Sequence, residues 1–198
     1  MADKREDPCD NKQVPEIRQI PNLWLRKAAT IIFAWDLDKD GYAGYDDTMN
    51  TAERFIRAGD MNGKSADNVI EFFRDYTKRK SDNPVEGIVK ARSLSEQLVG
   101  LWRAKSDPVA LKSLFQIYIH MFQIIDVNAK GYLTFDEYLV FWNTFKLDKR
   151  FARIQFDFMD TDQDGKISEE EFLNAHEDYL MNTEDDTLNR FYGPLINY

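Results

Sequence analysis

Residues 160–171 place oxygen-bearing side chains at fixed intervals in a short polar segment. Aspartates stand at the first, third and fifth positions, glycine at the sixth and glutamate at the twelfth. Hard divalent cations prefer oxygen ligands, and this spacing wraps one turn of chain around a single ion, with glycine allowing the positive φ that the turn needs. The segment therefore predicts a metal site whose ligands are Asp160, Asp162, Asp164, the Lys166 carbonyl and a bidentate Glu171, with Ser168 acting through water.

Residues 36–47 repeat this pattern with one change at the twelfth position. Aspartate stands there instead of glutamate, and its shorter side chain is expected to reach the ion through one oxygen. A lower coordination number favours a mixed Ca²⁺/Mg²⁺ site and weakens selectivity against the smaller ion. The predicted ligands are the side chains of Asp36, Asp38, Asp40 and Asp47 and the carbonyl of Tyr42.

Residues 126–137 keep the pattern except at the fifth position, where Lys130 stands. A protonated lysine has no lone pair to donate, although its long stem lets the ammonium swing into solvent and leaves the fifth position to water. Since only two acidic residues supply charge, we expect the weakest of the three sites here. Its members are Asp126, Asn128, the position held by Lys130, the Tyr132 carbonyl and Glu137.

A fourth segment, 82–93, aligns with the others through Gly87. Pro84 and Ser93 then replace the oxygen ligands at the third and twelfth positions, so no metal is expected there. Its expected role is structural. Val89 would pair with Ala43 of the first loop, as Leu133 would pair with Ile167.

Apolar residues at helical spacing flank these loops, as at 23–35, where Asn22 is a candidate N-cap. A loop between two amphipathic helices is the EF-hand unit, and the loops starting at Asp126 and Asp160 show it as an internal repeat. We therefore predict an all-α fold of four EF-hands in two packed pairs. The expected divisions are a mobile arm (1–21), an N-terminal pair (22–105) and a C-terminal pair with a tail (106–198), joined by a short bent linker within 101–110.

Composition restricts the possible partners. The chain has a formal charge of −9 and a pI near 4.8, which disfavours nucleic acid and anionic membranes. The single cysteine, Cys9, fits a reducing compartment, and no long apolar run predicts a membrane span. With two histidines and no glycine-rich phosphate loop, no catalytic centre is expected. The interpretation is a cytoplasmic, non-enzymatic protein, monomeric or weakly dimeric.

The chain resembles the invertebrate sarcoplasmic calcium-binding proteins, particularly the annelid type. The resemblance is carried by segments 22–25, 38–41, 52–55, 180–182 and 191–195, together with Asp47 at the end of its loop. It implies a compact protein that exchanges Ca²⁺ and Mg²⁺ in the cytosol of muscle or neurons through its first, third and fourth hands. It also implies no obligatory protein target and no enzymatic activity.

Two alternatives remain open. Coelenterazine-binding proteins and calcium-regulated photoproteins share this pattern, and His176 and Tyr192 resemble residues of theirs, whereas Leu180 and Tyr198 depart from it. A calcium sensor is the other alternative. Sensors expose methionine-rich grooves, but methionine is sparse here and aromatic residues fill the periodic positions, which favours a buffer.

Overall fold

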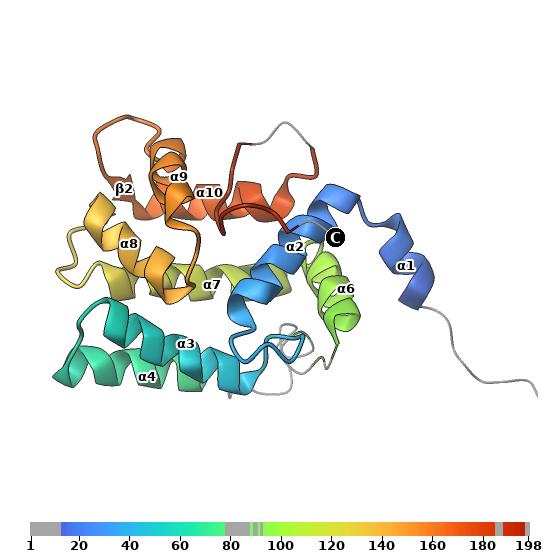
Figure 1. Ribbon diagram of the computed structural model, residues 1–198, viewed down its shortest axis with the longest axis horizontal. Coiled ribbons are helices and arrows are strands. Elements are labelled where there is room, and N and C mark those ends of the chain that lie inside the picture. Colours follow the sequence, from blue (N-terminus) through green and yellow to red (C-terminus); the bar gives the residue numbers. More distant parts are fainter. Residues whose placement is uncertain (1–12, 78–87, 89–90, 92, 185–187, 197–198) are drawn as a thin grey trace, which may run out of the picture.

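The computed structural model describes residues 13–77, 88, 91, 93–184 and 188–196 (Figure 1). The described part is helical with one small sheet, which confirms the predicted all-α fold. Its elements are α1 (Gln13–Gln19), α2 (Asn22–Trp35), α3 (Tyr45–Ala58), α4 (Gly63–Thr77), α6 (Leu94–Ala104), α7 (Pro108–Ile125), β1 (Tyr132–Leu133), α8 (Phe135–Thr144), η1 (Lys149–Phe151), α9 (Ala152–Met159), β2 (Ile167–Ser168) and α10 (Glu169–Met181).

The junction between α6 and α7 is shorter than the predicted linker. Helix α6 continues to Ala104, and Asp107 caps α7 by accepting hydrogen bonds from the N–H groups of Val109 and Ala110. Pro108 fits the first turn of α7 because a proline lacks the N–H that would otherwise be unpaired there. Helix α2 likewise begins one residue earlier than expected, with Pro21 instead of Asn22 at its N-cap.

The two C-terminal loops are joined by the predicted strand pair. Leu133 of β1 lies opposite Ile167 of β2 in an antiparallel register. Both side chains are fully buried, so the pairing also anchors the loops in the core. This confirms the pairing of Leu133 with Ile167.

A side chain of α6 holds the first metal loop. The side-chain amide of Gln97 accepts from the Ala43 N–H at 3.0 Å and donates to the Ala43 carbonyl at 2.9 Å. Val89, the predicted partner of Ala43, lies outside the described residues. The Gln97 amide also donates to the Ile88 carbonyl at 3.1 Å. One buried side chain from α6 therefore makes both hydrogen bonds that a paired strand would make with Ala43.

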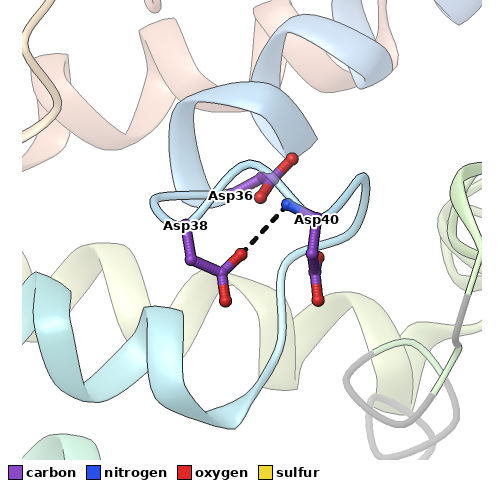
Figure 2. A group of neighbouring side chains, drawn as sticks. All are labelled: Asp36, Asp38 and Asp40. Carbon is purple, nitrogen blue, oxygen red and sulfur yellow. Dashed lines mark hydrogen bonds between the residues drawn. The ribbon is translucent and has the colours of Figure 1, made fainter.

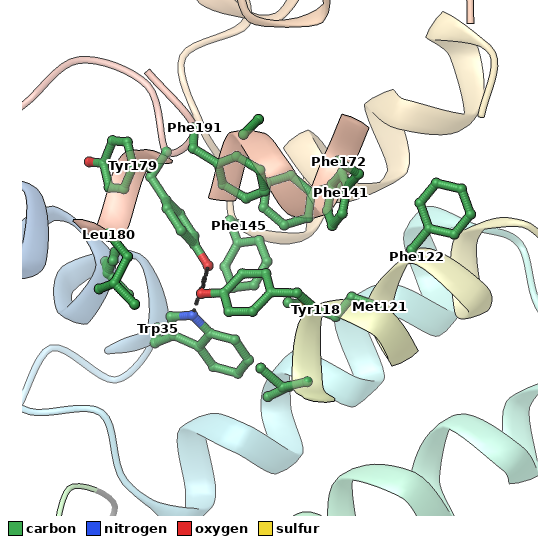
Figure 3. Close-up of a cluster of buried hydrophobic side chains, with 14 of the residues drawn as sticks. Trp35, Tyr118, Met121, Phe122, Phe141, Phe145, Phe172, Tyr179, Leu180 and Phe191 are labelled. Atoms are coloured by element: carbon green, nitrogen blue, oxygen red, sulfur yellow. Dashed lines mark hydrogen bonds between the residues drawn. The ribbon is translucent and has the colours of Figure 1, made fainter. Parts of the chain in front are cut away.

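The core is rich in aromatic side chains and is continuous through the chain (Figure 3). Trp35 of α2 donates to the hydroxyl of Tyr192 at 3.2 Å, and this hydroxyl lies 2.7 Å from that of Tyr118 on α7. Trp24 donates to the Leu180 carbonyl at 2.7 Å. These contacts join α2, near the start of the described chain, to α7, α10 and the C-terminal tail.

Part of the segment predicted to be a mobile arm is described. Helix α1 forms within it and contacts α6, where the Arg103 guanidinium donates to Glu16 at 2.6 Å. Ile20 is buried in the core. The described part of this segment is therefore helical and reaches the core; residues 1–12 lie outside the described part.

Candidate metal centres

Loop 4 (residues 160–171) connects α9 to α10 and collects its predicted ligands. One carboxylate oxygen from each of Asp160, Asp162 and Asp164 lies within 4.8 Å of the others. Gly165 has a φ of 80°, and its N–H donates to Asp160 at 3.0 Å. The Glu171 carboxylate faces the loop from the first turn of α10. The chain thus gathers three carboxylates at one point, and the Glu171 carboxylate accepts from the N–H groups of Thr161 and Ser168 at the two ends of the loop. Carboxylate oxygens are the donors that Ca²⁺ prefers.

Loop 1 (residues 36–47) connects α2 to α3 with the same geometry (Figure 2). One oxygen from each of Asp36, Asp38 and Asp40 lies within 4.8 Å of the others. Asp47 is buried, and its Oδ1 accepts from the Leu37 N–H at 2.6 Å. The twelfth-position carboxylate therefore folds back onto the start of the loop.

Electrostatics in loop 1 fit a bound cation. Asp36 is 1% exposed, and its Oδ1 has no hydrogen-bond partner among the described residues. A hydrogen bond from the Asp40 N–H lowers the pKa of Asp38, but partial desolvation and the carboxylates of Asp47, Asp40 and Asp36 raise it, and the net shift is upward. A divalent ion would supply both the partner for Asp36 and the positive charge that these carboxylates lack.

Loop 3 (residues 126–137) departs from this arrangement at Lys130. Its ammonium lies 2.7 Å from both carboxylate oxygens of Glu137. The expectation that this ammonium swings into solvent is therefore wrong, because the nearby carboxylate is a better partner than water. Asp126 is buried at the start of the loop, Asn128 is exposed, and Tyr132 follows the glycine as in the other loops.

The predicted second loop, 82–93, lies mostly outside the described residues: 82–87, 89–90 and 92 are not described. Ser93, its predicted twelfth residue, is the N-cap of α6, and its hydroxyl accepts from the Glu96 N–H at 3.2 Å. Ser168 and Thr134 make the same N-cap contact at the ninth position of their loops. The alignment of this loop through Gly87 stays a prediction.

A shared feature of the loops at their fourth position escaped prediction. Lys39, Ala129 and Gln163 all have positive φ, between 50° and 65°. Each lies two residues before the glycine, which also has positive φ. No special residue type marks these positions, so only the three-fold repetition of the loop pattern could have revealed them.

Comparisons with known proteins agree with this geometry. A family model described as EF hand matches residues 152–174, and one described as EF-hand domain pair matches 118–144. The sarcoplasmic calcium-binding protein of Hediste diversicolor is 31% identical over 178 residues, which are 88% of this chain and 99% of that protein. This chain belongs to the sarcoplasmic calcium-binding protein family. It is a calcium-binding EF-hand protein.

The family shares its architecture with ligand-binding relatives. The luciferin-binding protein of Renilla reniformis is 26% identical over 175 residues, which are 87% of this chain and 94% of that protein. The calcium-loaded apo form of a coelenterazine-binding protein from Renilla muelleri superposes with a TM-score of 0.68 at 22% identity, covering 94% of this chain and 99% of the other. No helix in the described part of this family member is long and apolar enough to cross a bilayer.

Proposed function

We propose that this sarcoplasmic calcium-binding protein buffers Ca²⁺ and Mg²⁺ in the cytosol through loops 1, 3 and 4. Loops 1 and 4 bind most tightly, and loop 3 binds more weakly because only Asp126 and Glu137 supply ligand charge there. The carrying observation is the pair of three-aspartate clusters closed by Asp47 and Glu171. The protein acts without a catalytic centre or an obligatory protein target.

The exposed apolar surface supports buffering over sensing. A sensor presents a continuous apolar groove when it opens. The large apolar side chains exposed in the described part lie on five separate segments, and only Ile154 and Phe158 share a helix, α9: Tyr45, Val109, Val127, Ile154, Phe158 and Leu188. Residues scattered in this way are ordinary surface residues and do not form a docking groove.

Calorimetric titration of the metal-stripped protein with Ca²⁺, with and without millimolar Mg²⁺, tests the buffer. We expect Mg²⁺ to weaken calcium binding most at loop 1, because the short Asp47 side chain suits the smaller octahedral ion. Asp47→Glu should restore a bidentate ligand and reduce the Mg²⁺ effect at loop 1 by roughly tenfold.

Asp46→Glu is the matched control, since it lengthens the neighbouring acidic side chain and leaves the twelfth position unchanged. Calcium binding that is weak and indifferent to Mg²⁺ in the wild type would contradict the buffering function.

A competing function, binding of a small organic ligand, would have to use one cavity in the core. It has a volume of about 100 Å³ and is lined mainly by apolar side chains, including those of Ile31, Trp35 and Leu180. His176 also lines it, stacked on Tyr118, and neither ring nitrogen has a hydrogen-bond partner among the described residues. Burial lowers the pKa of His176 to about 3, so the ring is neutral at physiological pH.

Coelenterazine is expected not to bind measurably to this protein, because pockets for ligands of drug size have volumes of about 300–1,000 Å³. Quenching of tryptophan fluorescence by added coelenterazine measures this directly. Saturable binding that is lost in His176→Phe, with calcium binding intact, would establish the organic ligand as a second function. His120→Phe is the control, since His120 lies outside this cavity.

A further inference from the structure

Loop 3 contains a positive charge at the place where its sibling loops bring carboxylates together. The Lys130 ammonium lies 2.7 Å from Oε1 and 2.7 Å from Oε2 of Glu137. Glu137 is the residue whose two oxygens would clamp calcium. The two side chains are only 25% and 27% exposed, so water screens their attraction less than at an open surface.

The partners of the twelfth-position carboxylate differ between loops. In loop 4, Oε1 of Glu171 accepts from the Thr161 N–H at 2.8 Å, and in loop 1 Asp47 accepts from the equivalent Leu37 N–H. In loop 3, Oε1 of Glu137 accepts from Lys130 instead. The carboxylate that closes the loop is thus already bound to a cation belonging to the chain.

Hydrogen bonds within loop 3 join its backbone to the carboxylates of Asp126 and Glu137. The Asp126 carboxylate accepts from the N–H groups of Lys130 at 3.0 Å and Gly131 at 2.7 Å. Glu137 Oε2 also accepts from the N–H and the hydroxyl of Thr134. Strand β1 is paired with β2 of loop 4. The loop therefore has complete local hydrogen bonding around the ammonium.

The ring of Tyr132 makes a second contact with the Lys130 ammonium. The ammonium of Lys130 lies 4.6 Å from the centroid of the Tyr132 ring, within the range of a cation–π contact. Lys166 of loop 4 lies 4.5 Å from the same centroid. Tyr132 thus contacts one lysine from each of the two paired loops, and only that of loop 3 reaches a twelfth-position carboxylate.

We propose that Lys130 is an internal cation, which holds loop 3 closed without metal and competes with calcium for Glu137. This inference rests on the proposed buffering function and predicts the order in which the loops fill. Calcium enters loop 3 only when the ammonium leaves both oxygens of Glu137, so loop 3 stays metal-free at calcium concentrations that fill loops 1 and 4. Loop 4 meanwhile keeps an ordered partner strand.

Titration of the wild type and of Lys130→Asp tests the competition. We expect two tight calcium equivalents in the wild type, with a third binding at least about 100-fold more weakly, and three tight equivalents in Lys130→Asp, because the substitution removes the competitor and adds a ligand. Lys149→Asp is the matched control. It makes the same change of charge at an exposed lysine in η1, outside the three loops, so the stoichiometry should not change.

Nitrogen-15 NMR of the lysine ammonium groups gives a readout independent of stoichiometry. In the metal-free protein, the Lys130 ammonium signal should be protected from solvent exchange, and it should move only at the last calcium equivalent. Three equal sites in the wild type, or an unprotected Lys130 signal, would overturn the inference and leave the buffer intact. A protected signal with no tight calcium binding in any variant would instead overturn the buffering function alone.

Discussion

Glu171→Gln is expected to lower the calcium affinity of loop 4 by roughly 100- to 1,000-fold, which removes one tight equivalent from the titration. The substitution keeps the size of the side chain but takes away its negative charge and one of the two oxygens that hold the ion. A bidentate carboxylate at the twelfth position cannot be replaced by an amide, whose nitrogen carries hydrogen and does not coordinate calcium.

The contacts of Glu171 explain why its loss cannot be compensated locally. Its Oε1 accepts from the N–H and hydroxyl of Thr161, and its Oε2 accepts from the N–H and hydroxyl of Ser168. One carboxylate therefore joins both ends of the loop. In glutamine, the amide nitrogen would meet an N–H donor at one of these ends, so the closed loop would be weakened even before metal is added.

Isothermal titration of the variant against the wild type measures this loss. Glu170→Gln is the matched control, because it removes the same charge from the neighbouring exposed residue. It should keep the wild-type number of tight sites. An unchanged number of tight sites in Glu171→Gln would show that loop 4 is not a calcium site.

The second large effect is expected in the core, where Phe191→Ala should lower the free energy of unfolding by about 3–5 kcal/mol. Phe191 belongs to the C-terminal tail and is completely buried. Its ring lies 5.1 Å from that of Phe172, 5.3 Å from that of Phe141 and 5.3 Å from that of His176, measured between centroids. Removing it leaves a cavity among rings that cannot all move inward.

Urea unfolding of the metal-free protein, followed by circular dichroism, measures the difference. Leu188→Ala is the control, because that residue lies in the same tail but is 74% exposed, and it should change stability by less than about 0.5 kcal/mol. A loss below about 1 kcal/mol for Phe191→Ala would mean that the tail is not part of the core.

The geometry of the metal loops was largely predictable from sequence because it is local. The spacing of Asp160, Asp162 and Asp164 fixes which oxygens meet, and Gly165 fixes the turn between them. The helices on either side follow from apolar periodicity. Even the strand pair Leu133 and Ile167 could be predicted, since each residue stands at the eighth position of its own loop.

Contacts between residues far apart in the sequence could not be predicted from local spacing and periodicity. Gln97 makes hydrogen bonds with both backbone groups of Ala43, although 54 residues separate them and no motif marks the glutamine. The side chain of Lys130 could point to solvent or to Glu137 with the same sequence, and local packing decides between them. The prediction of a mobile arm over residues 1–21 did not anticipate the burial of Ile20, because that burial depends on surfaces contributed by later helices.

The contacts of α2 with the far end of the chain carry a consequence for folding. Trp24 donates a hydrogen bond to the Leu180 carbonyl, 156 residues away. Arg26 donates to the Ile196 carbonyl, 170 residues away, and the Thr30 hydroxyl accepts from the Ile196 N–H, 166 residues away. Such contacts have a high entropic cost of closure, which is recovered only when most of the chain is already arranged. We therefore expect the chain to fold as one cooperative unit, in which the first described helices reach their native packing only when the C-terminal segments are present.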